Sequence, residues 1–199
     1  MRTFDLFVVK LEKTLNDSIT TDSGLELYID TKYHEFENRV TEGPVVAVPF
    51  KYETGVQPGD TLYFHHLVVI NDGQPLTGEP DHYIVRYSED NAVSNQAIAF
   101  KASGSDAIVP LAGWSLLEPV EEEEVQESEI IEVVKLKQKP TTRGRVAFTS
   151  SGIEALGLEV GDVVGFKENR DYRIKIDGKE YYRTRTEDLM YKELDSDGE

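Results

Sequence analysis

Short apolar runs, rich in Val, Ile, Leu, Phe and Tyr, recur along the chain between clusters of Gly, Pro, Asn and Asp. Runs of this length, bounded by turn residues, predict β-strands rather than helices. We therefore expect an all-β chain built as small barrels or sandwiches. The expected strands cover residues 4–11, 43–48, 61–70, 82–87, 97–100, 114–120, 143–148, 163–166, 172–176 and 180–183.

One turn-strand pattern occurs twice, at residues 56–64 and again at residues 158–166. In the first copy, Pro58 suits the second position of a type II turn because its ring fixes φ. Gly59 suits the third position, which needs a positive φ. The β-branched and aromatic residues that follow fit a pleated strand. The repeat indicates a duplicated small β-domain.

Elements on either side of this unit also recur in the same order. The order predicts two tandem domains, residues 1–112 and 113–199. The closing apolar segment at residues 106–109 is expected to correspond to residues 188–191. The first domain also carries an insertion within residues 67–95, to which the sequence assigns no role.

Two local patterns in the second domain predict specific turns. Ser151 followed by Glu154 matches a capping box, which predicts one helical turn just after it. The pair Asp177-Gly178 lies between two short apolar runs and predicts a tight β-hairpin turn.

A long polar loop, residues 12–38, contains an unexpected apolar patch. Two interpretations fit its period-two spacing. Leu25, Leu27 and Ile29 could lie on a short edge strand and face a core. Alternatively, the patch could be an exposed tag that docks on a partner and orders as it binds. Spacing alone favours the edge strand.

The second domain carries an acidic loop at residues 121–142, where glutamates surround a second apolar patch. Its apolar members include Ile130, Ile131 and Val133. A run of like charges in such a loop indicates a solvated surface.

Composition narrows the classes of function. The net charge of −17 argues against nucleic-acid and acidic-membrane partners, which select basic patches. The absence of cysteine fits a reducing cytoplasm. No apolar stretch is long enough to span a bilayer, and the N-terminus lacks the pattern of a secretion signal.

The sequence offers little for catalysis. If His65 and His66 lie on one strand, their side chains point to opposite faces and cannot share a metal. No HExxH, EF-hand, phosphate-binding or G-x-S-x-G pattern occurs. We therefore expect no catalytic residue, no metal site and no cofactor, and the protein is not expected to be an enzyme.

The ordered motifs resemble the co-chaperonin (GroES-like, chaperonin-10) family. The second half carries the Arg143-Gly144-led strand, the Val160-Gly161-Asp162 turn and a closing hairpin. The first half is similar at Pro58-Gly59-Asp60, and residues 63–66 (YFHH) look most like phage-encoded co-chaperonins. The resemblance covers nearly the whole chain and implies two tandem GroES-like β-barrels.

For the first loop, the resemblance favours the docking tag over the edge strand. It implies a mobile loop over about residues 12–38, in which residues 24–27 (Gly24, Leu25, Glu26, Leu27) dock on the large, GroEL-like chaperonin subunit. Ile130, Ile131 and Val133 stand in the corresponding loop of the second copy. Two departures from the family pattern are Glu26, where an apolar residue is usual, and the short connections at residues 50–57 and 149–159.

The family further implies a ring or other homo-oligomer, cytoplasmic localisation (host cytoplasm for a phage-encoded protein) and ATP hydrolysis by the partner only. The function implied is to cap a chaperonin ring and assist protein folding. The alternative is a structural or adaptor module, such as a virion-associated protein, built on the same barrel without chaperonin binding.

Overall fold

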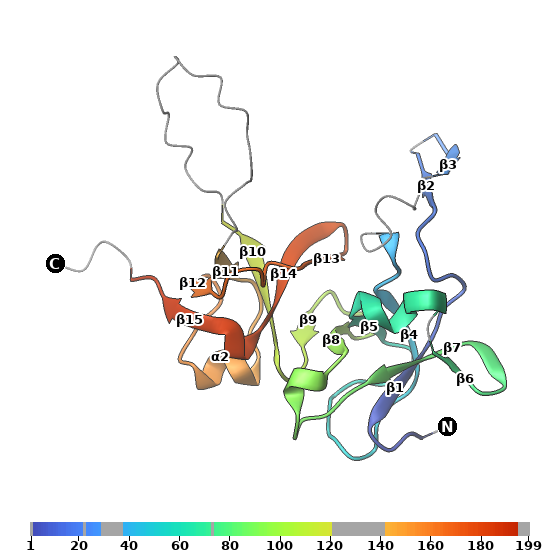
Figure 1. The fold of residues 1–199 in the computed structure, drawn as a ribbon, viewed down its shortest axis with the longest axis horizontal. Helices are drawn as coiled ribbons and strands as arrows, with labels where there is room; N and C mark the ends of the chain where they lie inside the picture. Colours follow the sequence, from blue (N-terminus) through green and yellow to red (C-terminus); the bar gives the residue numbers. More distant parts are fainter. Residues whose placement is uncertain (1, 22, 29–37, 73, 121–141, 195–199) are drawn as a thin grey trace. The chain divides into compact units, whose positions relative to one another are not determined.

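The computed structural model describes residues 2–21, 23–28, 38–72, 74–120 and 142–194. The chain divides into two compact units, Met1–Gly113 and Trp114–Glu199 (Figure 1). Each unit is built on its own antiparallel sheet, so the prediction of an all-β chain is confirmed. In neither sheet do the described outer strands pair with each other, so the sheets are open rather than closed barrels.

The sheet of the first unit has seven strands in the order β6-β7-β1-β4-β5-β8-β9. A separate two-stranded sheet, β2-β3, lies in the long loop between β1 and β4. The strands are β1 (Leu6–Lys10), β2 (Ser18–Thr20), β3 (Glu26–Tyr28), β4 (Glu42–Ala47), β5 (Thr61–Phe64), β6 (Pro75–Leu76), β7 (Glu79–Arg86), β8 (Ala97–Lys101) and β9 (Ile108–Pro110).

The sheet of the second unit has six strands in the order β13-β14-β10-β11-β12-β15. One short helix, α2 (Ser151–Ala155), lies in the connection from β11 to β12. The strands are β10 (Trp114–Pro119), β11 (Arg143–Val146), β12 (Val163–Phe166), β13 (Arg173–Ile176), β14 (Lys179–Arg185) and β15 (Leu189–Lys192).

The two sheets share one strand order. The series β6-β7-β1-β4-β5-β8 in the first unit matches β13-β14-β10-β11-β12-β15 in the second, and β9 is the additional strand. The register agrees as well: Val9 pairs with Tyr83 as Leu117 pairs with Tyr182. The pairing register also shifts at the same place in both sheets, between Tyr63 and Phe64 in β5 and between Gly165 and Phe166 in β12.

This topology corrects one sequence alignment. The strand that occupies the place of β15 is β8, residues 97–101, and not the segment at residues 106–109. The latter begins β9, which pairs with the outer edge of β8. Both segments are short apolar runs after a polar residue, so sequence could not separate them. With this alignment, residues 65–96 correspond to residues 167–188, so the first unit has about ten additional residues in this stretch, about half of the roughly twenty expected within residues 67–95.

Each unit has its own buried apolar cluster. In the first unit, Val9, Leu62 and Phe64 are among the fully buried members. In the second, Leu117, Val164 and Phe166 take the same strand positions. The β5 and β12 residues are equivalent in register, so the two sheets bury the same face of the same strand.

The predicted turn before β5 is confirmed, and it occurs in both units. Gly59 and Gly161 have φ of 95° and 99°. The Asp60 N–H donates to the Gln57 carbonyl at 3.1 Å, and the Asp162 N–H donates to the Glu159 carbonyl at 3.2 Å. These are the hydrogen bonds that close a β-turn.

Of three other local predictions, one is confirmed and two are corrected. The hairpin at Asp177-Gly178 is confirmed, with φ of 49° and 81° at the two turn residues. The capping residue of α2 is Ser150 rather than Ser151, because the Ser150 hydroxyl accepts from the Ile153 N–H at 3.3 Å. The strand predicted to run to residue 70 instead ends at Phe64 and continues as a 3₁₀ helix.

No helix in the part of the chain that the structure describes is both long enough and apolar enough to cross a bilayer.

Candidate functional site

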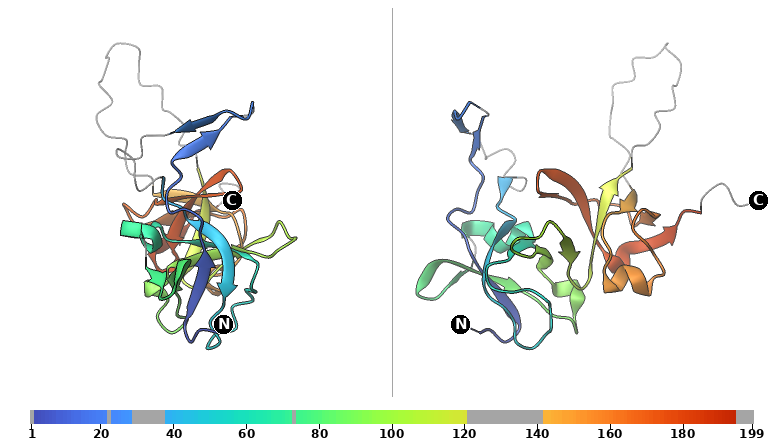
Figure 2. Two further views of the ribbon diagram at one scale, coloured as in Figure 1. Left: turned by 90° about the vertical axis from the view of Figure 1, so that its right-hand side faces the viewer. Right: turned by 180° about the vertical axis from the view of Figure 1, so that it is seen from behind.

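The apolar patch of the first long loop lies on a β-hairpin. Strands β2 and β3 pair antiparallel, with Ser18 opposite Tyr28 and Thr20 opposite Glu26. This ribbon belongs to the two-stranded sheet, and none of its described residues forms a strand pair with the seven-stranded sheet. Figures 1 and 2 show it extending away from β1 and β4. The segment is therefore an appendage of the first unit.

The interpretation of this patch as a core-facing edge strand is wrong. Leu25 and Leu27 are 59% and 50% exposed, and neighbouring Tyr28 is 79% exposed. Period-two spacing is produced equally by a buried strand face and by an exposed one, so sequence alone could not separate them. Ile29 lies outside the described residues.

Strand β3 presents Leu27 on one face and Glu26 and Tyr28 on the other. Successive side chains of a strand point to opposite sides, so Glu26 points away from the face that carries Leu27. The backbone register places Ile19 directly opposite Leu27. Glu26 therefore does not interrupt the exposed apolar face, although it lies between the two leucines in sequence.

The tip of the hairpin is closed by hydrogen bonds between Thr21 and Leu25. The Thr21 N–H donates to the Leu25 carbonyl at 2.9 Å, and the Gly24 N–H donates to the Thr21 carbonyl at 2.8 Å. Gly24 has φ of 80°, a conformation that a side chain disfavours. Gly24 and Leu25 were predicted as site residues, whereas Thr21 was not, because a threonine in a polar loop does not by itself mark a turn.

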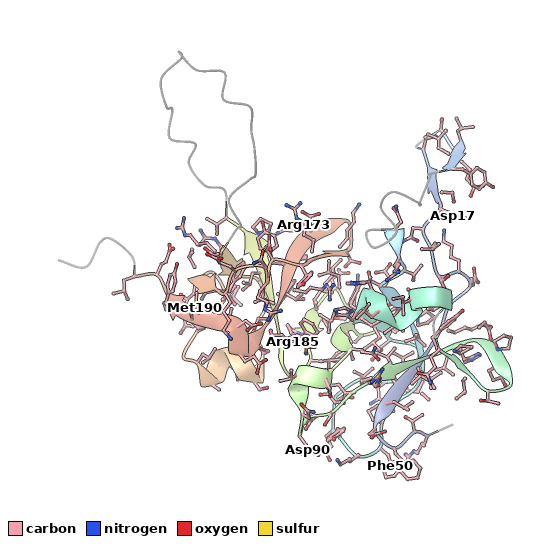
Figure 3. All side chains as sticks on the ribbon, in the orientation of Figure 1. Asp17, Phe50, Asp90, Arg173, Arg185 and Met190 are labelled. Carbon is pink, nitrogen blue, oxygen red and sulfur yellow. The ribbon has the colours of Figure 1, made fainter. Side chains whose placement is uncertain are left out.

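The base of the loop is also tied together. Leu15 forms an isolated antiparallel bridge with Arg39. The Asn16 N–H donates to the Asn38 carbonyl at 2.6 Å, and the Val40 N–H donates to the Thr14 carbonyl at 2.9 Å. This neck anchors the hairpin at the point where the chain leaves and re-enters the seven-stranded sheet. Asp17, labelled in Figure 3, lies just beyond it.

The second predicted docking patch is not described. Ile130, Ile131 and Val133 fall within residues 121–141, outside the described ranges. The structure fixes only the strands on either side, β10 and β11, which occupy the same sheet positions as β1 and β4.

The outer edge of β15 is a second exposed feature. In the first unit, the equivalent strand β8 is covered by β9, with Phe100 opposite Val109. No described strand covers β15 in this way. Met190, Tyr191 and Leu194 are 56%, 50% and 87% exposed along it, and Figure 3 labels Met190 on this strand.

The aspartates of the two Gly-Asp turns bind within their own sheets. The Asp60 carboxylate accepts from the Gln57 N–H at 2.8 Å and from the Ser103 N–H at 2.9 Å. The Asp162 carboxylate accepts from the Glu159 N–H at 2.8 Å and pairs with Lys192 at 2.8 Å. Each carboxylate thus ties its turn to the chain at the last matching strand, β8 or β15. The Lys192 ammonium and the Glu159 N–H hold the pKa of Asp162 below its usual value.

The histidines require one correction. The rings of His65 and His66 lie 4.3 Å apart, so the prediction that they point to opposite faces is wrong. Strand β5 ends before them, and the chain turns into the 3₁₀ helix. His82 instead lies beside Asp81 and Glu79, which together could supply ligand atoms to a cation. Asp81 is already engaged by His82 Nδ1 at 2.8 Å and by Lys10 at 3.4 Å.

Comparison with known proteins provides independent evidence of the family to which this chain is similar. The family model described as the chaperonin 10 kDa subunit matches residues 107–192. A co-chaperonin GroES of Coprothermobacter proteolyticus is 33% identical over 90 residues, which cover 42% of this chain and 91% of that protein. A co-chaperonin GroES of Kosmotoga olearia is 29% identical over 85 residues, which cover 43% of this chain and 94% of that protein.

Proposed function

This chain belongs to the chaperonin 10 kDa subunit family, and from that membership we propose that it acts as a co-chaperonin. It caps the ring of a GroEL-type chaperonin and helps to enclose a substrate protein. Its role is to bind and to shape a chamber, while the partner hydrolyses ATP. The observation that carries the proposal for this chain is the projecting hairpin with Leu25 and Leu27 exposed on it.

The first unit is a second, more diverged copy of the family fold. The family model matches residues 107–192, which contain all of β10 to β15. The first unit supports the proposal of a second copy by its strand order and by its Gly-Asp turn. On this account the protein is a tandem double co-chaperonin.

Leu25 and Leu27 are the docking side chains of the first copy. Each exposes half or more of its surface while the hairpin is free, and burial of such side chains is favourable by about 1.5–3 kcal/mol each. Glu26 points away from their face and stays in water. Gly24 allows the turn that leads into them. An apolar groove on the chaperonin is the complementary surface.

We assign Ile130, Ile131 and Val133 to a second docking segment, between β10 and β11. These strands correspond to β1 and β4, which flank the first hairpin. Glutamates surround this segment, so its docking is weaker than that of the first hairpin wherever the groove lacks basic residues.

Self-association uses the uncovered edge of β15. An exposed sheet edge presents unpaired backbone groups that take up another strand. The first unit closes the same edge internally with β9, which indicates that this position suits a further strand. Leu194 and Met190 add apolar surface beside it.

The test is complex formation with a GroEL-type chaperonin in the presence of ATP. We expect the protein to co-elute with the ring on size-exclusion chromatography and to slow its ATP turnover. It should also raise the yield of a denatured substrate protein that refolds only inside a closed chamber. Failure to form a complex with several such chaperonins overturns the proposal and favours a structural or adaptor module.

A further inference from the structure

The Thr21 hydroxyl makes three hydrogen bonds within the hairpin tip. Its Oγ1 accepts a hydrogen bond from the Leu25 N–H at 3.1 Å and donates to the Leu25 carbonyl at 3.2 Å. The Ser23 hydroxyl lies 2.9 Å away. A hydroxyl has one hydrogen to donate and can accept twice, so Ser23 is the donor in that pair.

These contacts hold the backbone of Leu25 at both of its polar groups. The Leu25 N–H is bound by Thr21 Oγ1, and the Leu25 carbonyl is bound by the Thr21 N–H and hydroxyl. The adjoining strands are only three residues each. An isolated two-stranded hairpin is marginally stable in water, so turn contacts decide how often it is formed.

Leu25 is also the first exposed apolar residue after this turn. Its direction is set by the backbone that Thr21 holds, while the Thr21 side chain itself is only partly exposed and makes its bonds inside the tip. Thr21 therefore acts on the apolar face without being part of it.

We propose that Thr21 is a positioning residue, which sets the affinity for the chaperonin by holding Leu25 in its docking conformation before contact. The proposal rests on the proposed function, because it assumes that Leu25 docks. A partner that binds only the formed hairpin has an apparent Kd inversely proportional to the fraction formed. Removing the Thr21 hydroxyl lowers that fraction and leaves every docking side chain in place.

The experiment compares the wild type with Thr21→Val, Thr21→Ser and Ser23→Ala. Valine keeps the branched shape and loses the hydroxyl, whereas serine keeps the hydroxyl. Two quantities are measured for each protein: Kd for a GroEL-type chaperonin with ATP, and the hairpin population from NMR amide exchange at Leu25. The thermal midpoint of the full chain checks that the seven-stranded sheet is intact.

We expect Thr21→Val to raise Kd about fivefold and to speed exchange of the Leu25 amide by a similar factor, because the variant loses both of the exposed hydrogen bonds that the hydroxyl makes to Leu25. Thr21→Ser and Ser23→Ala should stay within about twofold of the wild type, because both keep the bonds to Leu25. If Thr21→Val speeds exchange without changing Kd, or changes neither, the inference is wrong. If the wild type itself fails to bind, the proposed function fails first, and the inference fails with it.

Discussion

The ring of Tyr191 lies directly across the backbone of Gly165. The two residues are opposite each other in the pairing of β12 with β15, and a Cβ atom on Gly165 would overlap the ring. The phenol thus occupies the space that a side chain on the inner strand would take. This contact fixes the edge strand of the second unit against the strand that follows the Gly-Asp turn.

The first prediction tests this contact. Gly165→Ala should destabilise the second unit by about 1 kcal/mol, because the half-exposed ring of Tyr191 must swing away and lose its packing on β12. Guanidinium unfolding, followed by far-ultraviolet circular dichroism, measures the loss. The matched control introduces Gly165→Ala into a protein that already carries Tyr191→Ala. In that protein the ring is absent, so Gly165→Ala should lower the free energy of unfolding by much less. Equal costs in both backgrounds would show that the overlap is not the cause.

The second prediction concerns pH. The pKa of Asp162 is depressed in the folded state, first by Lys192 and then by the Glu159 N–H. A depressed carboxyl pKa gives stability that is present above the unfolded pKa, about 3.9, and lost as the pH falls through the folded value. Below about pH 4, the unfolding midpoint of the wild type should therefore fall more steeply than that of Asp162→Asn. Parallel curves for the two proteins would contradict this assignment.

A third prediction follows from the turn at the hairpin tip. Gly24 has φ of 80°, and a Cβ atom there meets no neighbour within 4 Å, so Gly24→Ala adds strain without a clash. The left-handed conformation costs a side chain about 1–2 kcal/mol. We expect chaperonin affinity to fall by about tenfold. Gly104→Ala is the control, since Gly104 has φ of 78° and equally open space outside the hairpin. A similar loss of affinity in both variants would refute a specific role for Gly24.

The fourth prediction concerns the edge of β15. Met190→Asp combined with Leu194→Asp adds charge beside an exposed strand, which discourages pairing with another chain. Sedimentation velocity should show the wild type as an oligomer and this variant as smaller species. Leu67→Asp with Val93→Asp adds the same charge at exposed apolar residues of the first unit and should leave the oligomer intact. A monomeric wild type, or an unchanged variant, would contradict assembly through β15.

Much of the sheet architecture could be predicted from the sequence. Strands β4 and β10 were predicted because each is an apolar run that begins or ends at a turn residue. The apolar run at residues 67–70 was misassigned, because periodicity cannot separate a short buried strand from a buried helical turn. Val68 and Val69 are both buried although adjacent, which a 3₁₀ helix allows and a one-sided strand does not.

The candidate site was less predictable for a physical reason. Leu25 and Leu27 were found from their spacing, but their exposure depends on whether another part of the sheet covers them. Whether a distant part of the chain packs on these leucines is not encoded in the local sequence pattern. Thr21 was missed because a threonine in a polar loop carries no signal until the turn brings it to Leu25. The assignment of Ile130, Ile131 and Val133 to a docking segment stays a prediction.

The most direct test of the central claim is the Kd for a GroEL-type chaperonin with ATP, measured for Leu25→Asp combined with Leu27→Asp. We predict a loss of affinity of about a hundredfold or more relative to the wild type, because two leucines that docking would bury are replaced by charges. Leu67→Asp with Val93→Asp adds equal charge to exposed positions outside the hairpin and should bind as the wild type does. Wild-type affinity in the Leu25 and Leu27 double variant would show that this hairpin is not the docking element.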